Sequence, residues 1–94
     1  MKFLAIEKEV VGIKEGQFTP FLKDESIKVL ELYEKGIIRE IYFNQNHCAV
    51  IILECKSIIE VKNELNKLPL VSQGLIYFEL SELKPYTGFS RLLN

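Results

Sequence analysis

The sequence is poor in the residues that build metal and redox sites. It holds two cysteines, Cys48 and Cys55, and no C-x-x-C motif among its 94 residues, which excludes a metal or redox centre of that type. On one strand the two cysteines would lie about 23 Å apart and on opposite faces. That separation rules out a disulfide between them within the strand. We therefore expect both to be buried apolar thiols.

An excess of positive charge and a long apolar run are missing as well. Twelve basic and thirteen acidic residues give a formal net charge of −1, too little positive charge to follow a phosphate backbone. The longest apolar run, 48–53, is far shorter than the roughly 20 residues that span a bilayer, and it lacks the aromatics of an RNA-binding strand. Glu7 interrupts the apolar start, unlike in a signal peptide. We expect a cytoplasmic protein without nucleic-acid or membrane partners.

Hydrophobic periodicity predicts two helices among four strands. Thr19 and Pro20 are typical of a helix start, and Gly36 of the position just after a helix end. A capping box begins at Ser57, and Pro69 ends the helix that follows it. The predicted strands are 2–9, 37–43, 47–54 and 75–80, and the predicted helices are 20–35 and 58–68.

This order, β-α-β-β-α-β, predicts a ferredoxin-like α+β fold. The expected four-stranded antiparallel sheet has the order 4-1-3-2, with both helices on one face. A length of 94 residues fits a single domain. We expect residues 1–94 to form that domain, with residues 84–94 as a C-terminal tail.

The sheet is apolar on the face that the helices leave bare. On the third predicted strand Val50 and Ile52 point to one face, and Ala49 and Ile51 to the other. A face of this kind needs a second cover. The same face of a second copy is an economical one, which predicts a two-fold, sheet-on-sheet homodimer or a higher oligomer of dimers. The apolar tail would pack on a partner chain; alternatively, it folds back over its own sheet.

The sequence resembles the muconolactone isomerase family, in the dimeric α/β-barrel group, over nearly the whole chain. The matching pieces occur in the family's order and at about its spacing. They are Asp24-Glu25, Gly36-Ile-Ile-Arg39, His47, Leu68-Pro69-Leu70 and a closing strand at 75–80.

The resemblance implies a dimeric α/β barrel that catalyses a proton shift on an unsaturated lactone or a related small organic acid. It also implies a role in the catabolism of aromatic compounds, with no metal or organic cofactor. The chain departs from the family at residues 37–42, which carry fewer aromatic residues. The substrate therefore stays open. The alternative is a non-catalytic ligand-binding or assembly module of the same group.

The resemblance points to Glu25 and His47 as catalytic residues. Glu25 matches a glutamate implicated in the proton shuttle, and it lies about 60° from the apolar stripe of Leu22, Val29 and Tyr33. Burial at the border of the core would raise its pKa. His47 is the only histidine, and histidine is the residue type best suited to proton exchange near neutral pH. The alternatives are a solvated glutamate near a helix N-terminus and a histidine bonded to the preceding turn.

Arg39 is the predicted binding group for a substrate carboxylate, because a guanidinium binds a carboxylate through two parallel hydrogen bonds. The alternative for Arg39 is an ion pair with a neighbouring glutamate at the sheet edge.

Strand alternation adds four further candidates for substrate binding. Glu7 shares a face with Phe3, and Glu79 lies on the face of Tyr77, which we expect to line the barrel interior. Tyr42 and Tyr77 would supply hydroxyl groups to the same cavity as Glu79. The alternative for Glu7 and Glu79 is ion pairing across the dimer interface.

Overall fold

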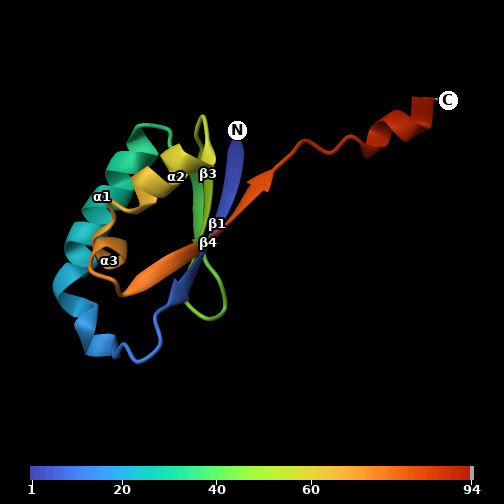
Figure 1. Cartoon of the computed structure of the whole chain (residues 1–94). Coiled ribbons are helices and arrows are strands. Elements are labelled where there is room, and N and C mark those ends of the chain that lie inside the picture. The colour runs from blue at the N-terminus through green and yellow to red at the C-terminus, as the bar shows by residue number, and fades with distance from the viewer. Residues whose placement is uncertain (94) are drawn as a thin grey trace.

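The computed structural model describes residues 1–93, and Asn94, the last residue of the predicted tail, lies outside them. Within that range the chain forms four strands and three α-helices (Figure 1). The strands are β1 (Lys2–Glu9), β2 (Ile38–Phe43), β3 (Ala49–Glu54) and β4 (Ile76–Leu83). The helices are α1 (Leu22–Glu34), α2 (Ile58–Leu65) and α3 (Pro69–Ser72). None of the helices in residues 1–93 is long and apolar enough to cross a membrane.

The strands form one antiparallel sheet in the order β2-β3-β1-β4. This is the predicted order 4-1-3-2 read from the other edge, so the ferredoxin-like α+β topology is confirmed. The helices all lie on one side of the sheet (Figure 1). β1 pairs with β4 from Lys2 opposite Leu83 to Glu9 opposite Ile76. Because this pairing continues past Leu80, β4 is longer than the predicted 75–80.

The first helix begins later than predicted and ends where predicted. Thr19 opens a separate 3₁₀ turn, Thr19–Phe21, so the prediction that it caps the helix was wrong. Gly36 follows the helix with a φ of +79°, a conformation that glycine adopts without steric cost. The amide of Ile37 donates to the Leu32 carbonyl at 3.0 Å, which completes a Schellman cap.

The second predicted helix is divided in two. α2 ends at Leu65, and Pro69 starts α3 instead of only ending the preceding helix. Proline suits a first helical position because its missing N–H has no partner there. Leu68 and Leu70, on either side of it, are both buried, so this short helix still packs on the sheet.

The third strand begins at Ala49, two residues later than predicted. The Asn44 side chain accepts hydrogen bonds from the amides of Asn46 and Cys48, at 2.9 and 3.0 Å, which extends the turn. Cys48 is therefore half-buried in that turn, whereas Cys55 is buried as predicted.

The core lies between the helices and the face of the sheet that they cover. Its members are apolar residues with almost no exposed surface. The fully buried ones are Phe3, Ala5, Leu32, Ile38, Ile51, Leu53, Val61 and Leu68. On α1, Leu32 is the buried residue and Val29 packs against the core, while Leu22 and Tyr33 are about half exposed. The buried side of α1 therefore lies part of a helical turn away from the apolar stripe that the sequence predicts.

The other face of the sheet is uncovered in the single chain. Leu4 and Ile6 on β1, together with Val50 and Ile52 on β3, point to this face and are half-buried. We call it the open face. After β4 the chain continues as an arm, residues 84–93, that projects from the sheet on the side opposite the helices (Figure 1).

Two alanine substitutions on α2 test which side of the helix stabilises the fold. Leu65 is 3% exposed and Ile59 is 68% exposed. Leu65→Ala should lower the free energy of unfolding by about 2–5 kcal/mol, because it leaves a core cavity. Ile59→Ala should change it by less than about 1 kcal/mol. Urea denaturation measures both, and equal losses would contradict this packing.

Candidate active site

Glu25 lies in the first turn of α1 and is half-buried. Its Oε1 accepts a hydrogen bond from the amide of Leu70 at 2.9 Å. Leu70 is the second residue of α3, and the first amides of a helix have no partner within the helix. The carboxylate supplies that partner and links two helices that are 45 residues apart in the chain.

The surroundings of Glu25 raise its pKa above the ordinary value of 4.5. Burial of the carboxylate is the main cause, since it penalises the charged form, and the negative charge of Glu7 adds to it. The hydrogen bond from Leu70 acts in the opposite direction and lowers the pKa. A raised pKa brings a carboxyl group closer to the range in which it exchanges protons near neutral pH.

Glu7 lies on the face of the sheet that the helices cover, beyond Phe3 and Ala5 on β1. Its Oε1 accepts a hydrogen bond from the amide of Ala49, the first residue of β3, at 3.0 Å. Glu7 and Glu25 are thus two carboxylates at the same end of the helix-sheet interface, each held by one backbone amide.

His47 lies in the turn between β2 and β3, at this same end of the sheet. It has a φ of +60°, an uncommon conformation for a residue with a side chain. Its imidazole is exposed and stacks on Phe43, with ring centroids 4.1 Å apart. The His47 amide donates to the Asn44 carbonyl at 2.9 Å. This is the bond to the preceding turn that the alternative interpretation of His47 expects.

Arg39 lies at the opposite end of α1 from Glu25. Its Nε donates to the Gly36 carbonyl at 2.7 Å, just beyond the helix C-terminus. A helix rises 1.5 Å per residue, so Gly36 is about 16 Å from Glu25 along the axis. Within one chain the structure does not bring Arg39 to Glu25. It also places Arg39 at an irregularity of the β2–β3 pairing, between Ile38 and Glu40.

The remaining candidates, Tyr42, Tyr77 and Glu79, lie on the open face. The Tyr42 hydroxyl donates to Glu40 Oε1 at 2.8 Å, and this hydrogen bond raises the pKa of Tyr42. Glu79 lies 4.0 Å from the Lys8 ammonium. Tyr42 is on one edge strand and Tyr77 on the other, three strand spacings or about 14 Å apart. One chain therefore does not bring their two hydroxyl groups to a common point.

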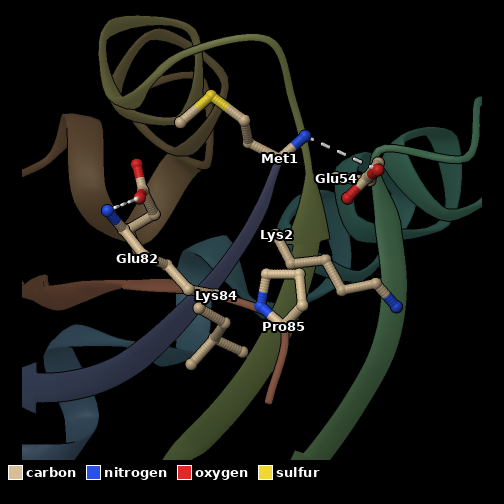
Figure 2. Close-up of a pocket in the computed structure, with 7 residues that line it drawn as sticks. Met1, Lys2, Glu54, Glu82, Lys84 and Pro85 are labelled. Carbon is tan, nitrogen blue, oxygen red and sulfur yellow. Dashed lines mark ion pairs between the residues drawn. The ribbon is translucent and has the colours of Figure 1, made fainter. Parts of the chain in front are cut away.

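A cavity of about 620 Å³ lies at the end of the sheet where the arm begins (Figure 2). Glu25 does not line it. Its lining is Met1, Lys2, Glu54, Glu82, Leu83, Lys84 and Pro85. The Met1 amine is 3.6 Å from Glu54 Oε1, and Lys84 is 3.6 Å from Glu82 (Figure 2). The other oxygen of Glu54, Oε2, is buried with no hydrogen-bond partner among the described residues.

Sequence reasoning missed two features of these regions. The Leu70 amide is a main-chain donor, so no side-chain motif reveals it, although Pro69 at a helix start signals free amides nearby. Glu54 ends an otherwise apolar strand, and only the pairing of β1 with β3 brings it to the N-terminus. Within residues 1–93, no cluster of three or more histidine, cysteine or acidic residues is arranged to hold a metal ion.

A scan against models of protein families matches none, and a search of curated proteins finds no relative. Among solved structures, the chain is similar to muconolactone isomerase, with a TM-score of 0.74 and 19% identity over 93% of this chain and 92% of that one. It is also similar to 5-chloro-2-hydroxyhydroquinone dehydrochlorinase from Burkholderia phenoliruptrix, in complex with 2,5-dihydroxybenzoquinone. The TM-score there is 0.68, with 17% identity over 94% of this chain and 98% of that one. At these identities the likeness confirms the fold.

The raised pKa of Glu25 predicts how stability changes with pH. A carboxyl group whose pKa is higher in the folded state stabilises the fold fully below its unfolded pKa, and that contribution is lost as the pH rises through its folded pKa. Glu25→Gln keeps an oxygen for the Leu70 amide but does not titrate. We therefore expect the variant to gain stability relative to the wild type between pH 4 and pH 7.

Thermal unfolding of the two proteins across this range measures the difference. Asp24→Asn, at the exposed neighbouring position, is the matched control. If the wild type instead gained stability relative to Glu25→Gln as the pH rose, the pKa of Glu25 would be lower in the folded state than in the unfolded state. That result would contradict a raised pKa.

Proposed function

We propose that the chain is a small isomerase that needs no cofactor and shifts a proton on an unsaturated lactone or a related small organic acid. The observation that carries the proposal is Glu25, a half-buried carboxyl group with a raised pKa in the fold of muconolactone isomerase. Such a reaction requires one group that removes a proton next to a carbonyl and returns it at another carbon.

Glu25 is the proposed proton carrier. Its Oε1 accepts the Leu70 amide, which holds the carboxylate in place, so Oε2 is the oxygen that exchanges the proton. With Oε2 near the substrate carbon, the carboxylate takes the proton and the substrate becomes an enolate. The same carboxyl group then returns the proton to the other end of the conjugated system, and no net charge is gained or lost.

His47, Arg39, Glu7, Tyr42, Tyr77 and Glu79 keep their predicted roles in catalysis and substrate binding as part of this proposal. Because Arg39 is bonded to Gly36, which lies about 16 Å from Glu25 along the axis of α1, one chain does not supply both groups to one substrate. The proposal therefore includes a second chain that completes the site. A sheet-on-sheet homodimer through the open face, or an oligomer of such dimers, is the proposed assembly.

The alternative function is a non-catalytic ligand-binding or assembly module. It is favoured by one specific observation, the bond between Glu25 and the Leu70 amide, because that bond gives the carboxylate a structural role as a helix cap. The cytoplasmic location and the role in aromatic catabolism belong to the isomerase proposal and rest on the sequence and its resemblance.

Deuterium exchange into an unsaturated lactone tests the isomerase proposal. In D₂O, the wild type should catalyse exchange at the carbon next to the carbonyl of a muconolactone-like substrate, followed by NMR. Glu25→Gln should lower the rate by about 10²–10⁴-fold, the usual contribution of a general acid-base group. Asp24→Asn should stay within about twofold of the wild type, since that side chain is exposed.

Exchange by the wild type no faster than in buffer would remove the proposed activity. A rate that Glu25→Gln leaves unchanged would remove Glu25 as the proton carrier. In either case folding must be intact, which circular dichroism of each variant verifies.

The dimer is tested by a charge on the open face. Ile52 lies at the centre of that face, so Ile52→Lys should separate the two chains by placing unpaired charges in an apolar interface. Light scattering should report a mass close to the 10.9 kDa monomer for this variant and a multiple of it for the wild type. Ile59→Lys on α2 is the control. A wild type that is monomeric at high concentration would exclude the proposed assembly.

A further inference from the structure

An aromatic side chain outside the candidate set lies at the Glu25 end of the sheet. Phe43 is the last residue of β2 and is 64% exposed. It lies directly opposite Ala49 on β3, and cross-strand partners place their side chains on the same face of a sheet. Ala49 packs against the core, so Phe43 belongs to the face that the helices cover. Its exposed ring therefore borders the candidate site and not the open face.

Four residues, one from each strand, form a row across this end of the sheet. The register of β1 with β3, continued by one residue, places Glu7 opposite Ala49, whose amide the Glu7 carboxylate accepts at 3.0 Å. On its other side, Glu7 lies opposite Phe78 of β4. We call this set the end row: Phe43, Ala49, Glu7 and Phe78. Phe43 and Glu7 are two strand spacings apart, about 10 Å, with only the short side chain of Ala49 between them.

The start of α1 lies at the same end of the sheet as the end row. Only residues 35–37 separate α1 from β2, so the helix returns antiparallel to the strand and packs against it. Figure 1 shows the start of α1 and the turn between β2 and β3 at one end of the molecule. Burial raises the pKa of Glu25 and the nearby charge of Glu7 raises it further, which fits this placement. Glu25 and the end row therefore belong to one site.

His47 stacks on Phe43 in a conformation that the turn enforces. The two ring planes are 18° apart, with centroids separated by 4.1 Å. His47 has a φ of +60°, and residues held in sparsely populated conformations gather at ligand sites. Asn44 fixes this turn through its carbonyl, which accepts the His47 amide, and through its side chain, which accepts the Cys48 amide. His47 is exposed, so the imidazole face turned away from Phe43 is open to a ligand.

We propose that Phe43 and His47 form a stacking platform for a flat, conjugated substrate ring, with Phe43 as the positioning residue that holds the imidazole. This inference rests on the proposed function, because the platform serves the reaction assigned to Glu25. Stacked π-systems pair through their faces, so a planar ring fits this surface better than a puckered, saturated one. The substrate class narrows to lactones and related acids whose ring is flat and conjugated.

The competing role of the pair is to stabilise the turn between β2 and β3. A contact with that role alone needs no ligand and makes no distinction between flat and puckered rings. The place of Phe43 in the end row favours the platform, because the same row carries the Glu7 carboxylate that acts on Glu25.

Proton NMR of the imidazole tests whether Phe43 holds His47. Because His47 is the only histidine, its two ring C–H signals are read without isotope labelling. Stacking on a benzene ring shifts them upfield, so Phe43→Leu should move them downfield and Phe43→Tyr should leave them in place. Tyr33→Leu, which removes an exposed ring on α1, is the matched control and should not move them. Circular dichroism verifies that each variant is folded.

Lactone binding tests the platform itself. The probes are an α,β-unsaturated butenolide, whose ring is flat, and the saturated γ-butyrolactone, and the His47 signals follow each titration. The wild type should bind the butenolide more tightly, and Phe43→Leu should weaken that binding by about 2- to 12-fold, the value of an aromatic pair. Phe43→Tyr should restore it. His47→Asn, whose side chain tolerates the positive φ, should bind both probes alike, which changes in the lactone signals report.

His47 signals at the same position in the wild type and in Phe43→Leu would overturn the proposal, because the rings would then not be stacked in solution. Equal affinity of the wild type for the two lactones, or no shift of the His47 signals with either, would overturn it as well. Neither readout requires turnover. Absence of deuterium exchange with both readouts positive would remove the isomerase activity and leave the platform as a ligand-binding site.

Discussion

The structure depends on one constraint: three helices cover one face of a four-stranded sheet and leave the other face bare. An antiparallel sheet needs a cover only on faces that carry apolar residues, and in this chain both faces carry them. The covered face forms the core around Phe3, Leu32 and Leu53. The open face and the arm lie outside this packing in the single chain.

The constraint also decides where chemistry can occur in one chain. The space between helices and sheet is filled by the core except at its ends, so half-buried polar groups gather there. Glu25 and Glu7 occupy one end, each tied to the backbone of another element. The cavity beside Met1 and Glu54 lies at the other end of the sheet and is lined by strand residues and the start of the arm. The proposed isomerase uses the first end, whose carboxyl group has the raised pKa.

Much of the fold could be predicted because its signals are local or periodic. The strand order followed from the order of elements, and the end of α1 from Gly36, whose positive φ is a local requirement. The start of α1 could not be predicted, since Thr19-Pro20 is equally compatible with a 3₁₀ turn. The buried side of α1 was predicted part of a turn away from Leu32, because a helix with apolar residues on two sides has no unique stripe.

The candidate site was less predictable than the fold, since it depends on distances between elements. Resemblance named Glu25 and Arg39 without showing that α1 separates them, and alternation placed Tyr42 and Tyr77 on one face without showing that they lie on opposite edges. The amide of Leu70 has no signature in the side chains. Such contacts become visible only when the packing of α1, α3 and the sheet is known.

The central claim is that Glu25 exchanges a proton with a bound lactone. A crystal structure of the assembled protein soaked with a slowly reacting unsaturated lactone tests it most directly. The account predicts the carbon next to the lactone carbonyl at about 3–3.5 Å from Glu25 Oε2, a distance suited to proton transfer. A lactone held elsewhere, such as in the cavity beside Met1 and Glu54, with Glu25 still bonded to Leu70 and out of reach, would contradict it.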